Sequence, residues 1–194
     1  MTSEGPFELI PQSAEIPTHP EIPTLIQLAK ALHEVGLMPP YGSGDHGNLS
    51  FRTSDGFVIT ARQTRKASLY PDQLVRVAAC TRIPTGIRVA FDGHAMPSTD
   101  APMHGMLYQR RPDIGVIVHG HDVQTLVKAP TLELPMTQTS ARVASLELVE
   151  EVVSLAATYD YILMRDHGFV ALGRSFQSAN ELVMHWFYRA RAVS

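Results

Sequence analysis

The sequence predicts a single α/β domain in which helices cover a mixed, largely antiparallel sheet. Segments with apolar residues at helical spacing alternate with pairs of short apolar segments separated by turns. Such closely spaced strand pairs favour antiparallel pairing and disfavour a repeating βαβ array, whose parallel strands need long crossovers. The chain has 194 residues, of which 44% are hydrophobic, and this is enough for one full core.

The first half of the chain begins with a segment that lacks a clear period. Residues 1–20 contain four prolines and few large apolar side chains, so we expect a flexible arm ahead of a domain at 21–194. Helical spacing predicts a helix at 22–35, which ends at Gly36. A hairpin is expected at 48–60 around the turn Ser54-Asp55-Gly56, followed by strands at 75–80 and 87–91.

The second half of the chain alternates more regularly between predicted helices and predicted strands. Asp100 is typical of a helix N-cap, Pro102 suits the first helical turn, and Pro112 ends that helix. A β-branched strand is expected at 115–119. Helical spacing predicts helices at 144–158 and 176–191, and between them lie strands at 161–164 and 169–172, joined by a tight turn at 165–168.

Composition excludes several classes of protein. The net charge is -3 without a long run of one sign, so we expect neither a nucleic-acid partner nor a membrane partner. No apolar run approaches the roughly 18 residues of a membrane-spanning helix, and the N-terminus does not read as a signal peptide. Cys80 is the single cysteine; we expect it to be a small core residue of a cytoplasmic protein.

The main chemical signal is a cluster of histidines. His119 and His121 lie two residues apart in a predicted strand, so their imidazoles point to the same face. His167 lies in the tight turn between two apolar strands. Three neutral imidazoles with one open position would form a catalytic zinc site. The pair alone also fits two partly exposed histidines, or the metal site of a cupin-type oxygenase, which would be an all-β chain.

Four short blocks, at 47–52, 97–100, 111–121 and 166–168, add a more specific signal because they follow one another in a set order. They match a glycine-asparagine-aliphatic-serine block, a proline-serine helix start, an arginine-proline-aspartate segment that leads into H-x-H, and a histidine-glycine turn. With these blocks, the chain from 22 to 192 resembles the class II (zinc-dependent) aldolase family, whose relatives include the adducin head domain. The resemblance implies a three-layer αβα fold with a central mixed, mainly antiparallel sheet, and a homotetramer with active sites at subunit interfaces.

The resemblance also implies a function. The chain would be a metal-dependent lyase that performs aldol cleavage on a small, phosphorylated hydroxy-carbonyl compound through a metal-stabilised enediolate. His119, His121 and His167 would hold Zn²⁺, although Co²⁺ or Mn²⁺ also binds imidazoles. Decarboxylases, epimerases and dehydratases of the same family share this chemistry, so the reaction stays open. A non-catalytic interaction module like the adducin head is a further alternative, but it has no need for three histidines.

Asp100 stands where the family usually carries the glutamate that moves the proton, so the resemblance assigns it this catalytic role. Aspartate is shorter by about 1.5 Å, and proton transfer needs heavy atoms within roughly 2.6–3.2 Å. Either the helix start lies further inward, or a water bridges the gap, or the role has moved to another residue. The N-cap role of Asp100 can coexist with catalysis. His104, one turn further on, is expected to pack against Asp100 or orient it.

The residues for the anionic end of the substrate match the family only in part. Gly47, Asn48, Ser98 and Thr99 are present, and the resemblance assigns them to phosphate binding. The glycine expected after the first hairpin is lost, and Arg62, Arg65 and Lys66 follow instead. One interpretation is that a cation of this loop, with Arg62 as our candidate, contacts phosphate or carboxylate directly. The other interpretation is a solvated basic loop. His46, next to Gly47, has two interpretations: a residue that lines the pocket, or, as we expect for a loop histidine, a surface residue.

Overall fold

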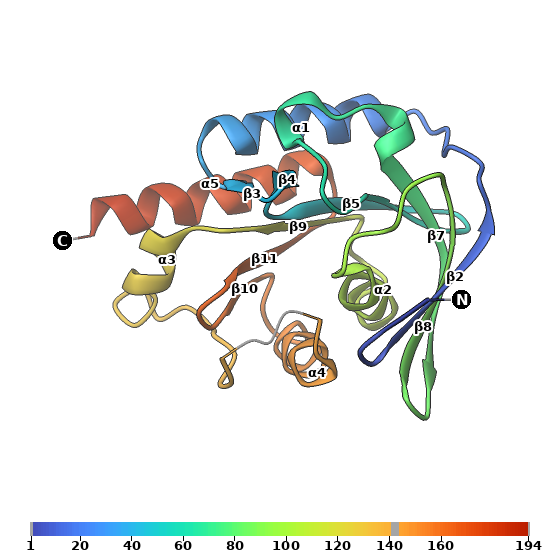
Figure 1. Cartoon of the computed structure of the whole chain (residues 1–194). Helices are drawn as coiled ribbons and strands as arrows, with labels where there is room; N and C mark the ends of the chain where they lie inside the picture. Colours follow the sequence, from blue (N-terminus) through green and yellow to red (C-terminus); the bar gives the residue numbers. More distant parts are fainter. Residues whose placement is uncertain (1, 141–143, 194) are drawn as a thin grey trace.

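The computed structural model describes residues 2–140 and 144–193, and within these ranges nine strands form one central sheet (Figure 1). The order across the sheet is β1-β2-β8-β7-β6-β5-β9-β11-β10, and every pair is antiparallel except β2 with β8. The strands are β1 (Thr2–Glu4), β2 (Phe7–Ser13), β5 (Asn48–Thr53), β6 (Gly56–Thr60), β7 (Leu74–Ile83), β8 (Gly86–Asp92), β9 (Val116–Gly120), β10 (Tyr161–Met164) and β11 (Gly168–Gly173). A separate two-stranded ladder pairs β3 (Pro40–Tyr41) with β4 (Gly44–Asp45).

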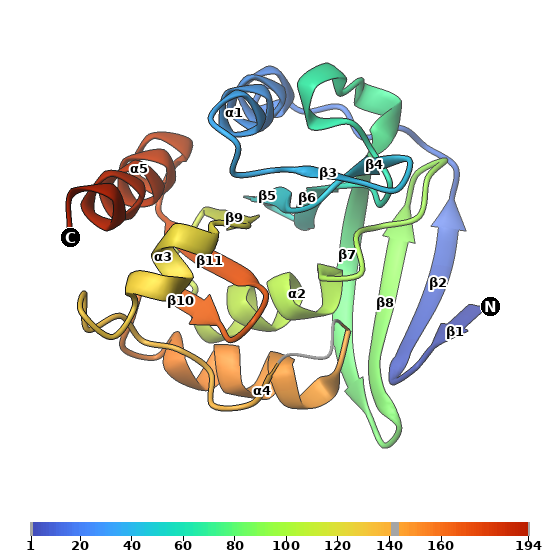
Figure 2. The same cartoon turned by 60° about the vertical axis from the view of Figure 1, so that its left-hand side comes forward.

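Helices cover both faces of the sheet, as Figures 1 and 2 show. Helices α1 (Ile22–Glu34) and α5 (Phe176–Ala192) pack on one face, and α2 (Ala101–Arg110) and α4 (Leu146–Leu155) pack on the other. The short helix α3 (Val123–Lys128) follows β9, and the 3-10 turns η1 (Lys66–Ser68) and η2 (Pro71–Gln73) precede β7. The predicted three-layer αβα fold with a mainly antiparallel sheet is therefore confirmed, and an all-β cupin is excluded.

Strand β9 illustrates how the sequence produces the two cores. Val116 and Val118 pack toward α1 and α5, whereas Ile117 packs toward α2 and α4. This alternation follows from the two-residue period of a strand, which sends neighbouring side chains to opposite faces. His119 is in phase with Ile117, so its ring lies on the α2 side of the sheet. The strand period therefore decides which helix the first histidine of the motif meets.

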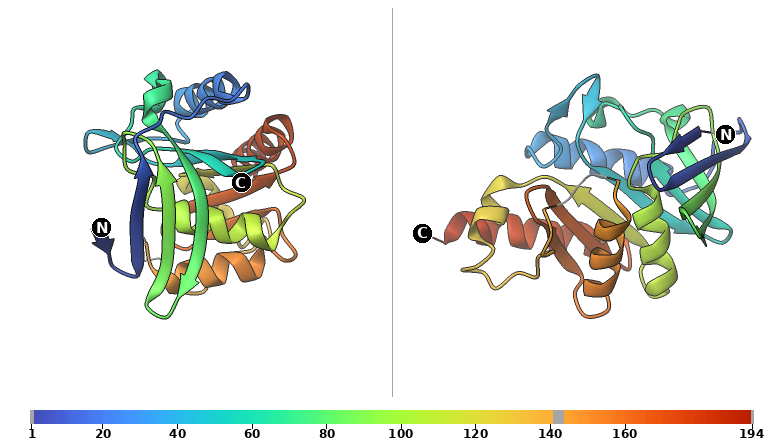
Figure 3. Two further views of the ribbon diagram at one scale, coloured as in Figure 1. Left: turned by 90° about the vertical axis from the view of Figure 1, so that its right-hand side faces the viewer. Right: turned by 60° about the horizontal axis from the view of Figure 1, so that its bottom comes forward.

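The N-terminal segment differs from the sequence expectation. The flexible arm expected over residues 1–20 is wrong for Phe7–Ser13, which forms β2 and pairs in parallel with β8 (Figure 3, left). Phe7 and Leu9 are buried in the core on the α2 side. Pro11 lies next to a register shift, where the missing N–H of proline is tolerated. The sheet, and hence the domain, begins well before residue 21.

The other predicted elements agree with the structure to within a few residues. The hairpin expected at 48–60 is β5–β6, and the helix expected to follow Asp100 is α2. The helix expected at 144–158 is the shorter α4, which begins after its N-cap Ser145 and ends at Leu155. Cys80 is buried, as expected. Among the described residues, no helix combines the length and apolar composition that crossing a bilayer requires.

Candidate metal centre

His119 occupies a fixed position in the middle of the sheet. On β9 it lies opposite Asn48 of β5 on one side and Val170 of β11 on the other. The Nδ1 atom of its buried ring donates a hydrogen bond to the carbonyl oxygen of Phe169 at 2.8 Å. Since a carbonyl oxygen only accepts, the proton of the neutral ring is on Nδ1 and the Nε2 lone pair faces away from the sheet.

His121 and His167 converge on the same point as His119. His121 follows the end of β9, and His167 lies in the β10–β11 turn after Asp166, which has a φ of +57°. The ring centroids are 5.0 Å apart for His119 and His121, 5.0 Å for His119 and His167, and 4.9 Å for His121 and His167. One ring nitrogen from each lies within 4.8 Å of the others.

The closest pair of ring nitrogens has the spacing that a tetrahedral ion requires. The Nε2 atoms of His119 and His167 are 3.2 Å apart. Two imidazole nitrogens at ~2.0–2.1 Å from one ion, in tetrahedral geometry, lie about 3.3–3.4 Å from each other. Two neutral donors therefore already lie close to the separation at which one ion binds both of them.

Two glycines allow the histidine-bearing segments to approach. A Cβ at Gly168 would lie 2.3 Å from the carbonyl oxygen of Gly120, so only glycine lets the β10–β11 turn lie against the end of β9. Gly47 has a φ of +78°, in the left-handed region, and a Cβ there would lie 2.7 Å from the carbonyl oxygen of His119. A larger residue at position 168 would move His167 away from its partners.

The electrostatics of the cluster favour neutral rings. Burial lowers the pKa of His119 well below its ordinary value. The pKa of His121 is lowered to about 2, mainly by burial and to a smaller extent by the charges of the neighbouring histidines. Burial also lowers the pKa of His167. The Nε2 atom of His121 is buried and has no hydrogen-bond partner among the described residues. Three neutral imidazoles, one of them with this unpaired buried nitrogen, fit a divalent transition-metal ion.

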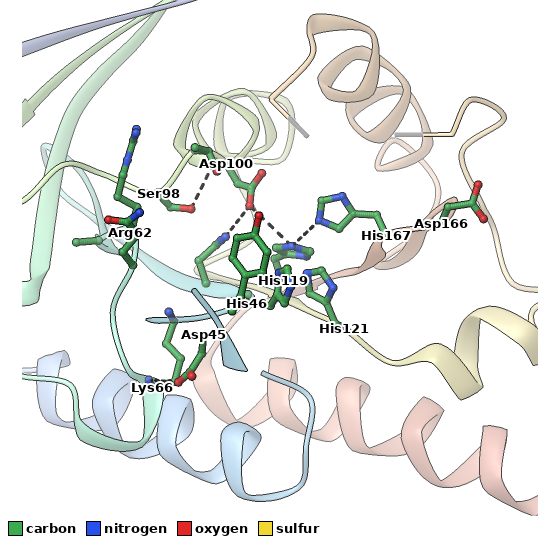
Figure 4. A pocket seen from close by; sticks show the side chains of 16 residues that line it. Asp45, His46, Arg62, Lys66, Ser98, Asp100, His119, His121, Asp166 and His167 are labelled. Atoms are coloured by element: carbon green, nitrogen blue, oxygen red, sulfur yellow. Dashed lines mark hydrogen bonds and ion pairs between the residues drawn. The ribbon is translucent and has the colours of Figure 1, made fainter. Parts of the chain in front are cut away.

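Asp100 presents its carboxylate to this cluster. Its Oδ2 atom accepts a hydrogen bond from the side-chain amide of Asn48 at 2.7 Å and lies 3.8 Å from Nε2 of His119 (Figure 4). Asp100 occupies the N-cap position of α2, as the sequence predicts, but its side chain makes no capping hydrogen bond. Pro102 at the second helical position has no N–H to offer, and the carboxylate accepts from Asn48 of the sheet.

A second polar contact lies behind Asp100, between the same strand and the same helix. Ser50, two residues after Asn48, meets Nδ1 of His104 at 2.7 Å and the hydroxyl of Tyr108 at 2.9 Å. Asn48 and Ser50 are two strand residues apart, about 6.6 Å, and Asp100 and His104 are four helix residues apart, about 6 Å. Because these two spacings are nearly equal, both residues of β5 can contact α2 at the same time. Among the described residues, the ring of His104 makes no hydrogen bond to the Asp100 carboxylate, although its main-chain N–H donates to the carbonyl oxygen of Asp100 at 3.0 Å. Burial lowers the pKa of His104 to about 4. Its contact to Ser50 helps hold α2 against the sheet.

The structure brings every predicted site residue to one cavity of about 600 Å³. The lining includes all nine of them: Gly47, Asn48, Arg62, Ser98, Thr99, Asp100, His119, His121 and His167. Ser98 accepts a hydrogen bond from the main-chain N–H of Asp100 at 3.3 Å. The Nε atom of Arg62 donates to the carbonyl oxygen of Pro97 at 3.0 Å. Five segments that are distant in sequence therefore line one cavity, as Figure 4 shows.

Sequence reasoning missed part of this lining. His46, expected at the surface, is partly buried in the cavity wall, with its ring centroid 4.3 Å from that of His121 and 4.2 Å from that of Tyr41. Lys66, a member of the predicted basic loop, is buried, so a fully solvated loop is wrong at this position. The positions of both residues are set by the β3–β4 ladder and η1. These elements are too short to show a periodic pattern of apolar residues in the sequence.

Strands of a mixed sheet between two helical layers, with histidines meeting at the strand ends, define the class II aldolase fold. The chain belongs to the family described as class II aldolase and adducin N-terminal domain, whose model matches residues 24–193.

Two curated relatives and a solved structure illustrate the range of this family. A 5-methylthioribulose-1-phosphate/5-deoxyribulose-1-phosphate aldolase from Rhodospirillum rubrum is 25% identical and covers 82% of this chain and 74% of the relative. A methylthioribulose-1-phosphate dehydratase from Pseudoalteromonas translucida is 24% identical, with 79% and 81% covered. The structure of an L-fuculose 1-phosphate aldolase has a TM-score of 0.71 at 23% identity, with 90% and 85% covered.

Proposed function

We propose that the chain is a metal-dependent lyase that acts on a small, phosphorylated hydroxy-carbonyl compound. The observation that carries this proposal is the convergence of three neutral imidazoles and the Asp100 carboxylate on one cavity. His119, His121 and His167 would hold the ion, for which zinc suits three imidazoles, while cobalt or manganese is compatible. A divalent ion there supplies a Lewis acid for the carbonyl and neighbouring hydroxyl oxygens of the substrate.

Asp100 is the proposed acid/base residue. In aldol cleavage its carboxylate takes the proton of the substrate hydroxyl whose carbon leaves as an aldehyde. The carbon–carbon bond breaks, and its electron pair passes to the remaining carbonyl fragment, to which the same carboxyl group returns the proton. Asn48 fixes one carboxylate oxygen at 2.7 Å, so Asp100 is oriented before substrate arrives.

The shorter reach of aspartate finds a physical explanation in the position of α2. Asp100 Oδ2 lies 3.8 Å from Nε2 of His119. Of the three alternatives that the sequence left open, this distance supports a helix start that lies close to the metal centre. The contacts of Asn48 with Asp100 and of Ser50 with His104 hold the start of the helix close to the metal centre.

The opposite end of the substrate would bind at the second group of predicted residues. Gly47, Asn48, Ser98, Thr99 and Arg62 line the same cavity as the histidines. Hydroxyl groups, an amide and a guanidinium are the donors that a phosphate accepts hydrogen bonds from. We assign them to the phosphate group. Assembly into a homotetramer and a cytoplasmic setting are part of the same proposal.

Dehydration is the second candidate reaction, favoured by the dehydratase among the relatives. In that case Asp100 would move the proton that accompanies loss of a hydroxyl group, and the carbon skeleton would stay intact. The two reactions share the metal centre and differ in which substrate bond breaks.

The test is incubation of the metal-loaded protein with ketose 1-phosphates, followed by NMR of the products. Aldol cleavage yields dihydroxyacetone phosphate and an aldehyde, dehydration yields one product smaller by one water, and decarboxylation of a keto acid phosphate yields carbon dioxide. Epimerisation yields a stereoisomer of the substrate. A protein that binds no divalent metal and converts none of these compounds would contradict the proposal and favour an interaction module like the adducin head.

A further inference from the structure

The cavity wall that does not carry the histidines contains a buried lysine. The side chain of Lys66 is only 1% exposed, yet it lines the cavity. Figure 4 shows its ammonium group directed into the space between Arg62 and His46. The chain has two further lysines, Lys30 and Lys128, and neither is buried.

Among the described residues, the hydrogen-bond partners of the Lys66 ammonium group are neutral. Its Nζ atom donates to the main-chain oxygen and the hydroxyl of Thr64, both at 3.1 Å. An ammonium has three N–H donors. Within residues 2–140 and 144–193, no carboxylate forms an ion pair with Nζ.

The nearest acidic residue, Asp45, is engaged elsewhere. One of its carboxylate oxygens accepts from the main-chain N–H of Lys66 at 2.6 Å, and the other pairs with Arg65 at 3.1 Å. His33 also approaches this carboxylate, at 3.3 Å. Asp45 therefore holds the backbone of the loop in place and leaves the Lys66 head group without a direct counter-ion.

A buried cation without a direct counter-ion is disfavoured by desolvation. Burial lowers the pKa of Lys66 to about 8, and the charge of Asp45 opposes this effect only in part. Buried charged groups with a shifted pKa cluster at functional sites. A ligand of opposite charge there supplies the counter-ion that the protein lacks. The histidines across the cavity are neutral and cannot play the part of that counter-ion. An anionic ligand would supply the direct counter-ion.

The two neighbouring arginines of the loop already have partners within the protein. Arg65 is half-exposed, pairs with Asp45 and does not line the cavity. Arg62 lines the cavity, but its Nε atom donates to the carbonyl oxygen of Pro97. Of the three cations that the sequence placed in this loop, Lys66 is the one with a desolvated head group at the cavity.

We propose that the ammonium of Lys66 binds the oxyanion, phosphate or carboxylate, at one end of the small molecule that occupies this cavity. The identity of the other end rests on the proposed function, since the hydroxy-carbonyl group would meet the histidines and Asp100. Lys66 thereby takes over part of the anion binding that the glycine missing from this loop would provide. The substrates that fit are those with an oxyanion at the end remote from the reacting carbon.

The experiment measures anion binding to the full-length protein without metal, by isothermal titration with inorganic phosphate and, separately, with acetate. The wild type is expected to bind one anion per chain, and Lys66→Met to bind it at least ten-fold more weakly. Lys30→Met is the matched control, because it removes the same charge from an exposed helix surface. Preference for phosphate assigns a phosphoryl group to the site, and preference for acetate assigns a carboxylate.

Two outcomes overturn the inference: equal affinity of the wild type and Lys66→Met for both anions, or no binding of either anion to the wild type. Circular dichroism and thermal unfolding show whether Lys66→Met is folded, and methionine preserves the length of the side chain. The measurement needs no turnover. A wild type that binds phosphate through Lys66 but converts no ketose 1-phosphate would contradict the proposed function and leave this inference standing.

Discussion

The side-chain amide of Asn48 donates a hydrogen bond of 2.7 Å to the carboxylate of Asp100, and this bond joins the central sheet to the start of α2. The same carboxylate oxygen lies 3.8 Å from Nε2 of His119. Asn48 and His119 lie opposite each other on neighbouring strands. The register of β5 and β9 therefore sets where the acid/base group meets the metal centre.

Replacement of Asp100 by asparagine tests the proton-transfer role. Asparagine retains an oxygen that can accept from Asn48, but it cannot take a proton. We expect kcat to fall roughly 10²- to 10⁴-fold, with metal content unchanged. Steady-state kinetics and metal analysis of the same sample measure both quantities. Asp113→Asn, in an exposed ion pair with Arg111, is the control and should retain activity. Full activity of Asp100→Asn would move the role to another residue.

Replacement of His167 by glutamine tests the metal centre. The variant removes one of three nitrogen donors, so bound metal after dialysis is expected to fall from one ion per chain to a small fraction. Plasma mass spectrometry measures the ratio of metal to protein. His185→Gln removes an exposed histidine of α5 and should leave the ratio unchanged. Equal metal content in both variants would exclude His167 as a ligand.

Replacement of Ser50 by alanine tests the contact that holds α2 against β5. The change leaves Nδ1 of His104 without its partner in a buried environment, whereas the hydroxyl of Tyr108 keeps its hydrogen bond of 3.4 Å to the carbonyl oxygen of Gly115. The free energy of unfolding is expected to fall by about 1–3 kcal/mol for the group left unsatisfied. Urea unfolding measures it. Ser54→Ala, in an exposed turn, should change the same quantity by less than about 0.5 kcal/mol. Equal stability of the two variants would mean that the contact contributes nothing.

Replacement of Lys66 by methionine should stabilise the protein while it weakens ligand binding. The pKa of Lys66 is lowered from 10.5 to about 8, mainly by burial. A lowering of this size corresponds to about 3 kcal/mol of destabilisation while the group is charged. At pH 7 the unfolding temperature of Lys66→Met is therefore expected to exceed that of the wild type, as measured by calorimetry without added anions.

The sign of the pH dependence follows from the direction of that pKa. Below pH 8 the lysine is charged in both the native and the unfolded state, so the full penalty applies. Between pH 8 and 10.5 the native state loses its proton first, and the wild-type protein regains stability relative to the variant. The difference between the two unfolding free energies should shrink over this interval. A constant difference would show that Lys66 is not desolvated.

Local pattern predicted most of the fold and the chemical groups of the site. The hairpin β5–β6 and helix α2 carry their turn and cap residues within the segment itself, and the spacing of His119 and His121 alone places both on one face. The parallel pairing of β2 with β8 joins segments about eighty residues apart, and no local period reports it. The orientation of Asp100 escaped prediction for a similar reason, because its partner Asn48 comes from a distant strand.

The parallel N-terminal strand bears on how fragments of this protein should be designed for expression. The family match starts at residue 24, and a recombinant fragment trimmed to that boundary would lose β1 and β2. The outer edge of β8 would then expose unpaired amide and carbonyl groups, together with the apolar surface that Phe7 and Leu9 cover. Such an edge recruits strands from other molecules. Insoluble aggregates from the shortened fragment would reflect the missing strand and would say nothing about the chemistry of the cavity.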